Sequence, residues 1–175
     1  MIHHTAISVI PSAGPESVCE IWKLHTLERG WGDVGYHFLI DPAGRIYEGR
    51  AGGINSIGGH FKGGNNGTLA IALLGNFMTD VVAEASFEAL VELLGALCHV
   101  LSIDPLEHRI HFATGLKLPT ICGHRDGNRS TECPGDELHR QLPEIRNRVK
   151  YLLAQPSPKR TSLKSEDTFL SEPRD

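Results

Sequence analysis

The sequence predicts a single α/β domain. Segments with helical periodicity alternate along the chain with short segments typical of strands, the pattern of a mixed fold in which helices cover a sheet. Residues 68–74 form a continuous apolar run, as expected of a strand that is buried on both faces. The 175 residues, 40% hydrophobic and 22% charged, suffice for one domain with its own core and exclude a wholly disordered chain.

The first half of the chain contains one predicted helix and two predicted strands ahead of the apolar run. Apolar residues at near-helical spacing predict a helix over residues 16–28. Residues 36–40 and 45–48 predict two short strands, because residues 41–44 between them have the composition of a hairpin turn. Residues 51–67 are rich in glycine and are expected to be irregular.

The second half is predicted to be mainly helical. Residues 83–101 carry one apolar stripe at helical spacing. Residues 102–123 show little periodicity, and long loops in compact domains are often functional. A last helix is expected from residue 138 to residue 152, and Pro143 is expected to break or restart it. Residues 155–175 are polar and predict a disordered tail after a domain that spans residues 1–154.

The charge and the hydropathy pattern exclude several classes of protein. The net charge of −4 argues against a protein whose main task is to coat nucleic acid or an anionic membrane. No apolar run approaches the roughly 20 residues of a membrane span. The N-terminus lacks the basic and apolar segments of a secretory signal, so we expect a chain that is cytoplasmic as encoded.

Among the ten histidines, a few occupy distinctive positions. His3 and His4 end a very short N-terminal strand, and His124 lies nine positions before Cys133. Zinc binds imidazole nitrogen and thiolate sulfur in a tetrahedral arrangement, and a catalytic site keeps one position open for water. A histidine near the start with a histidine and a cysteine near the end would form such a site. Unrelated polar loop residues and a buried cysteine would give the same pattern, so both interpretations are open here.

Seven short segments carry a more specific signal. In chain order they are IHHTA (2–6), RGWGDVGYHFLID (29–41), GRIYEGR (44–50), GGH (58–60), NGTLAIALLGNF (66–77), GHRD (123–126) and CPG (133–135). Because these seven segments occur together and in this order, the chain resembles the zinc-dependent N-acetylmuramoyl-L-alanine amidases, which include phage amidase-type lysozymes and peptidoglycan recognition proteins.

The resemblance implies a fold and an activity. The fold would be a central mixed, mostly parallel sheet flanked by helices, with a groove that holds the metal. The activity would be Zn²⁺-dependent hydrolysis of the amide between N-acetylmuramic acid and L-alanine in peptidoglycan or muropeptides. We expect a monomer without nucleic-acid partner, which meets the cell wall after release or export, as an endolysin does. The alternatives are a recognition module that binds peptidoglycan without catalysis, and a protein that uses the fold to contact another protein.

The resemblance places the metal ligands on three residues. They are His3, His124 and Cys133. His4 is expected to be a neighbour in the sheet, and it would be the ligand if the match to the family were displaced by one residue. The family normally has a longer strand before its first ligand, whereas two residues precede His3 here. Either the start is shortened or misassigned and the strand frays, or other elements hold His3. Arg125 is expected to help fix His124, as is the residue after it, Asp126.

Four further residues match functional positions of the family. Tyr36 would donate a hydrogen bond to water or to the oxyanion, or would simply pack in the core. Thr131, two residues before the cysteine ligand, would orient water or the oxyanion. His37 and His60 match positions that line the groove and are expected to contact substrate, with a purely structural role as the alternative. The other five histidines, His25 among them, have no partner pattern.

Overall fold

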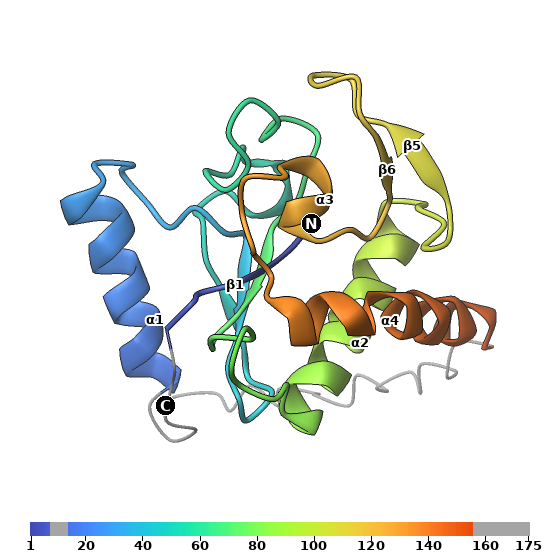
Figure 1. Cartoon of the computed structure of the whole chain (residues 1–175), viewed down its shortest axis with the longest axis horizontal. Coiled ribbons are helices and arrows are strands. Elements are labelled where there is room, and N and C mark those ends of the chain that lie inside the picture. The colour runs from blue at the N-terminus through green and yellow to red at the C-terminus, as the bar shows by residue number, and fades with distance from the viewer. Residues whose placement is uncertain (8–13, 156–175) are drawn as a thin grey trace, which may run out of the picture.

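A four-stranded sheet with the order β1-β4-β2-β3 lies at the centre of the computed structural model (Figure 1). The structure describes residues 1–7 and 14–155, so all of the predicted tail (155–175) except its first residue lies outside the described residues. The strands are β1 (Ile2–His4), β2 (Phe38–Ile40), β3 (Ile46–Glu48) and β4 (Ile71–Leu73). β4 pairs in parallel with β1 and β2, while β2 pairs antiparallel with β3, so the sheet is mixed as predicted.

Helices cover both faces of this sheet, which confirms the predicted fold class (Figure 1). On one face lies α1 (Gly14–Lys23), which continues into a π-helical turn, η2 (Leu24–Glu28). On the other face, α2 (Glu84–Val100) packs against α4 (Asp136–Ala154). The remaining elements are η3 (Gly53–Asn55), β5 (His108–Ile110), β6 (Lys117–Pro119) and α3 (His124–Gly127). Among the described residues, no helix is both long and apolar enough to cross a membrane.

The alternation of side chains along the strands divides the sheet into two faces. The aliphatic residues that pack with α2 and α4 are Ile2, Ile40, Ile71 and Leu73, each at most 1% exposed. Between them in the register lie His3, Ala72 and Leu39, which pair across β1, β4 and β2. Leu39 packs in the cluster around Ile21 of α1, so His3 points to the same side of the sheet as this cluster.

β1 is short but is held along both edges. One edge pairs with β4, and on the other the N–H of Ile2 donates to the carbonyl of Cys122 (2.7 Å) beside a parallel bridge to Gly123. The amino group of Met1 donates to the carbonyl of Leu69 (2.6 Å). His3 is only 1% exposed, and in the structure these contacts with β4, Cys122 and Leu69 hold the short strand that carries it.

Three elements differ from the sequence prediction. The segment expected to be without periodicity contains the β5–β6 hairpin, whose strands of three residues each are too short to show a periodic pattern. The first helix ends as an α-helix at Lys23 and finishes as a π-helical turn. α4 runs unbroken through Pro143, because four apolar residues around the proline are 0% exposed and their packing outweighs the backbone hydrogen bond that proline cannot make; they are Leu138, Leu142, Ile145 and Val149.

The β2–β3 hairpin is organised around Asp41, a carboxylate that is 0% exposed. It accepts hydrogen bonds from the Arg45 guanidinium (2.6 Å), the Tyr47 hydroxyl (2.7 Å) and the backbone N–H groups of Ala43 and Arg45. Burial alone would raise the pKa of Asp41. The hydrogen bonds from Tyr47 and Arg45 outweigh burial and hold the pKa below its ordinary value of 3.8.

We predict that Asp41→Asn lowers the free energy of unfolding at pH 7 by about 2 kcal/mol, since several hydrogen bonds to a charged acceptor weaken. Because the folded pKa is depressed, the carboxylate stabilises the fold fully above pH 3.8, and this contribution is lost as the pH falls further. Urea unfolding at pH 7 and at pH 3 measures the free energy of unfolding, and we expect the difference between wild type and variant to be smaller at pH 3. Glu20→Gln, in an exposed pair with Lys23, is the control with an expected change near zero. An equal unfolding midpoint for Asp41→Asn and wild type at pH 7 would contradict this account.

Candidate metal centre

Three side chains from distant parts of the chain meet beside β1. His3 comes from β1, His124 begins α3, and Cys133 lies in the loop between α3 and α4. One ligand atom from each lies within 4.8 Å of the others. The rings of His3 and His124 are 4.6 Å apart at their centroids, and Nδ1 of His3 is 3.5 Å from Sγ of Cys133. The structure thus brings together the three residues that the sequence predicted as metal ligands.

The short helix α3 sets the position of His124. It begins directly after Gly123, whose backbone N–H donates to the Asp126 carboxylate (2.8 Å). The other carboxylate oxygen of Asp126 lies 2.8 Å from Nε2 of His139 on α4. Asp126 therefore fixes the turn that carries His124, as expected. The Arg125 guanidinium pairs with the Asp136 carboxylate (2.5 Å), and the backbone N–H of Arg125 donates to the carbonyl of Cys133 (2.8 Å), so Arg125 ties α3 to the segment of another candidate ligand.

His4 does not join the three candidate ligands through its side chain. Its Nδ1 accepts a hydrogen bond from the backbone N–H of Phe77 (3.2 Å), and its ring stacks on the Phe77 ring. The backbone N–H of His4 donates to Sγ of Cys133 at 3.4 Å. Because neighbouring residues of a strand point to opposite faces, His3 rather than His4 faces the metal centre.

Burial keeps the three groups uncharged in the absence of metal. It is the main cause that holds the pKa of His3 well below its usual range, with smaller contributions from the rings of His60 and His124. Burial likewise lowers the pKa of His124 and raises the pKa of the Cys133 thiol to about 11. Neutral imidazole is the form that binds metal, so both histidines are ready to do so.

The centre also contains a polar atom that lacks a partner. Nε2 of His124 is buried and has no hydrogen-bond partner among the described residues. Burying such an atom without a partner costs free energy, and a metal ion would satisfy it. Two imidazoles and one thiolate are a donor set that zinc prefers in proteins. The residues present therefore fit a metal ion.

Tyr36 lies against the metal centre. Its ring centroid is 5.3 Å from that of His3 and 5.4 Å from that of His25. Burial raises the pKa of Tyr36 well above its usual value, so the hydroxyl stays protonated and can donate a hydrogen bond. The Thr131 hydroxyl accepts a hydrogen bond from the backbone N–H of Cys133 (3.2 Å), which ties it to a candidate ligand.

The two predicted substrate residues, His37 and His60, lie next to each other, with ring centroids 6.1 Å apart. His37 is 0% exposed, accepts from the N–H of Ala70 (3.0 Å) and donates to the carbonyl of Ser56 (3.0 Å). Nδ1 of His60 lies 3.0 Å from Nε2 of His3. Burial lowers the pKa of His60 to about 2, so its ring is neutral. Contact of either histidine with substrate stays a prediction.

Two residues near the centre carried no distinctive signal in the sequence. His25 is buried, and its Nδ1 accepts a hydrogen bond from the N–H of Gly35 (3.0 Å), next to Tyr36. The Thr68 hydroxyl lies 3.3 Å from Nε2 of His60. Thr68 falls within one of the seven family-like segments, but no local pattern indicates its contact with His60. His25 lies in a segment with helical periodicity, and this pattern does not indicate that the residue contacts Gly35 and Tyr36.

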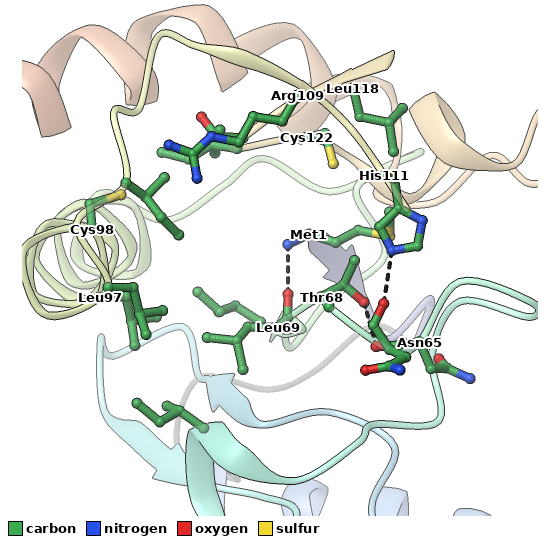
Figure 2. Close-up of a pocket in the computed structure, with 18 of the residues that line it drawn as sticks. Met1, Asn65, Thr68, Leu69, Leu97, Cys98, Arg109, His111, Leu118 and Cys122 are labelled. Carbon is green, nitrogen blue, oxygen red and sulfur yellow. Dashed lines mark hydrogen bonds between the residues drawn. The ribbon is translucent and has the colours of Figure 1, made fainter. Parts of the chain in front are cut away.

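The loop that carries His60 and Thr68 also makes hydrogen bonds on the side that faces away from the metal centre (Figure 2). Figure 2 looks into a cavity of about 540 Å³ that this loop shares with α2 and the β5–β6 hairpin. Figure 2 shows the carbonyl of Leu69 accepting from the amino group of Met1 (2.6 Å). The carbonyl of Asn66 lies 2.9 Å from Nε2 of His111. None of the three candidate ligands is among the described residues that line this cavity, so it is separate from the metal centre.

Comparison with known proteins gives a consistent result. Residues 1–136 match the family described as N-acetylmuramoyl-L-alanine amidase. Peptidoglycan-recognition protein LB of Drosophila melanogaster is 32% identical over 145 residues, which cover 81% of this chain and 56% of that protein. The N-acetylmuramoyl-L-alanine amidase of Sus scrofa is 31% identical over 147 residues, which cover 81% of this chain and 22% of the other. The chain thus spans about half or less of the length of these two relatives.

Solved structures show the same fold. Wild-type Drosophila PGRP-LB superimposes with a TM-score of 0.66 at 33% identity, covering 81% of this chain and 76% of that one. The N-acetylmuramoyl-L-alanine amidase LysC from Clostridium intestinale gives a TM-score of 0.64 at 30% identity, and the superposition covers 85% of this chain and 81% of that one.

We predict that Cys133→Ala weakens the binding of a divalent metal ion by at least about 100-fold, more than the loss of an outer-shell partner would. The wild-type chain should bind about one Zn²⁺ or Co²⁺ per molecule, measured by competition with a chromophoric chelator. Cys19→Ala is the matched control, because Cys19 is an exposed free cysteine on α1. Equal affinities of Cys133→Ala and Cys19→Ala would show that Cys133 is not a ligand.

Proposed function

The chain belongs to the N-acetylmuramoyl-L-alanine amidase family, and on that premise we propose that it is a zinc-dependent peptidoglycan hydrolase. The bond cleaved is the amide between N-acetylmuramic acid and L-alanine, in peptidoglycan or in muropeptides. The observation that carries the proposal is the convergence of His3, His124 and Cys133 within 4.8 Å, with a buried nitrogen of His124 that has no other partner among the described residues.

In this proposal His3, His124 and Cys133 hold the zinc ion. When bound, zinc supplies a Lewis acid that polarises the amide carbonyl and lets water act as a nucleophile near neutral pH. Three protein ligands suit catalysis, because a tetrahedral ion then has one position left for water or substrate. The thiol of Cys133 must lose its proton on binding zinc, since burial keeps it protonated in the metal-free protein.

Two side chains are placed to make hydrogen bonds to the amide that is cleaved or to the attacking water. The Tyr36 hydroxyl donates a hydrogen bond to the oxyanion as the carbonyl carbon becomes tetrahedral. Contacts of its ring with His3 and His25 hold it in place. The Thr131 hydroxyl accepts from the N–H of Cys133, so its own hydrogen is available to orient water or the oxyanion. A threonine is not acidic enough to act as a general acid at neutral pH, so its role is orientation.

The proposal also includes His37 and His60 as residues of the groove wall. His37 is 0% exposed and supports the wall from within, so contact with substrate falls to the exposed edge of His60. Both histidines stand near the metal centre in the segments 29–41 and 58–60, at positions that match groove-lining positions of the family. Several similar proteins are named as recognition proteins, and one similar solved structure is that of peptidoglycan recognition protein LE in complex with tracheal cytotoxin. The alternative that the experiment must distinguish is therefore a chain that binds muropeptides without cleaving them.

We predict that the purified chain with Zn²⁺ releases stem peptides with a free L-alanine amino group from defined muropeptides. Mass spectrometry of the products with zinc, and after removal of the metal with a chelator, is the measurement. Cleavage should stop when the metal is removed and return when zinc is added back. Muropeptide binding without any product in the presence of zinc would identify the chain as a recognition module instead.

We predict that Tyr36→Phe lowers kcat by about 10²-fold, the range for removing one oxyanion donor, with zinc content unchanged. Tyr151→Phe, on the exposed side of α4, is the control with wild-type rate. Steady-state kinetics on a muropeptide and metal analysis of the same samples give both values. A wild-type rate for Tyr36→Phe would leave Tyr36 with a packing role alone.

A further inference from the structure

A chain of polar contacts leads from the loop around Thr68 to the metal centre. The Thr68 hydroxyl lies 3.3 Å from Nε2 of His60, and Nδ1 of His60 lies 3.0 Å from Nε2 of His3. Nδ1 of His3 then lies 3.5 Å from Sγ of Cys133. The rings of His3 and His60 meet edge to face, with centroids 5.0 Å apart and an interplanar angle of 83°. Both nitrogens of each ring are therefore engaged.

The direction of these hydrogen bonds follows from Thr68. Its hydroxyl lies 2.9 Å from the carbonyl of Asn65 and 3.1 Å from the carbonyl of Gly64. Both contacts are shorter than the 3.3 Å to Nε2 of His60, and carbonyl oxygens only accept hydrogen bonds, so we assign the single hydroxyl hydrogen of Thr68 to one of these carbonyls. The contact with His60 must then run the other way, and Nε2 of His60 donates to the Thr68 oxygen.

The same reasoning extends through both rings. A neutral imidazole carries one N–H, so a proton on Nε2 leaves Nδ1 of His60 as an acceptor. Nε2 of His3 must then donate to it, which leaves Nδ1 of His3 without a proton. This bare nitrogen is the one that faces Cys133.

We infer that Thr68 and His60 are positioning residues that fix His3 in the tautomer with its proton on Nε2, so that Nδ1 is the atom that binds the metal. The inference rests on the proposed metal centre. A ligand histidine whose second ring nitrogen is hydrogen-bonded is fixed in both tautomer and orientation. In this chain the second partner is itself a histidine, and a hydroxyl group fixes its tautomer in turn.

The surroundings make this chain of contacts rigid. His3 is 1% and His60 is 8% exposed, so bulk water competes little for these nitrogens. The side-chain oxygen of Asn65 accepts from the backbone N–H groups of His60 (2.9 Å) and Phe61 (2.7 Å). The contact of Leu69 with Met1 (Figure 2) and that of Asn66 with His111 hold the far side of the same loop. The position of Thr68 is therefore set by the fold and not by the metal.

The first test reads the tautomers directly. In the metal-free wild-type chain, ¹⁵N NMR of the imidazole rings should show the proton on Nε2 in both His3 and His60. A proton on Nδ1 of His3 would overturn the inference. This measurement requires neither bound metal nor a variant, so its failure is distinct from a failure of the proposed hydrolase, which zinc binding and product analysis of the wild type test separately.

The second test uses matched variants and Zn²⁺ affinity, measured by chelator competition. Thr68→Val removes the hydroxyl at nearly constant shape and should weaken zinc binding several-fold, whereas Thr68→Ser should retain wild-type affinity. His60→Ala should weaken it by about 10–100-fold, the usual effect of an outer-shell partner. His60→Asn, whose side-chain oxygen can replace Nδ1 as an acceptor, should recover part of the loss. Equal affinities for Thr68→Val and Thr68→Ser, with unchanged thermal unfolding midpoints, would refute the role of Thr68, and wild-type affinity in His60→Ala would refute that of His60.

Discussion

The candidate metal centre depends on the parallel pairing of β1 with β4. Three residues of β1 pair with three of β4, and the alternation of the strand turns His3 toward one face and His4 toward the other. The bridge from Ile2 to Gly123 holds the second edge of β1 and at the same time places the start of α3 next to it. One short strand therefore positions its own ligand and also the segment that supplies His124. A change in the register of this pairing by one residue would replace His3 with His4.

The second property of the centre is that its groups are buried and neutral before any metal is present. Burial lowers the pKa of both histidines and raises that of the cysteine. The free-energy cost of removing these groups from water is therefore part of folding and not of metal binding. The packed rings around His3, from Tyr36, His60 and His124, restrict its motion, so little conformational freedom remains to be lost when a metal ion binds.

Much of the fold could be predicted from the sequence, and part of the site could not. The α2 pattern, the apolar β4 run and the β2–β3 turn signal predicted elements that the structure contains, because local periodicity and turn chemistry determine them. The resemblance named His3, His124 and Cys133, which the structure brings together. The contact between His60 and His3 joins residues 57 positions apart and follows no local pattern. The continuity of α4 through Pro143 also depends on tertiary packing, which local sequence rules do not contain.

The separation of the three ligands along the chain has a consequence for synthesis. His3 and Cys133 lie 130 positions apart, so the first candidate ligand leaves the ribosome long before the last. A nascent chain that ends before Cys133 lacks the only sulfur of the set, and the β1–β4 pairing needs residue 71 to be free of the exit tunnel. Domains generally fold as units, and a site that does not exist in the unfolded chain binds metal only together with folding. A metal ion therefore meets the complete candidate site only after Cys133 has left the ribosome, and translation products that end before Cys133 lack one of the three candidate ligands.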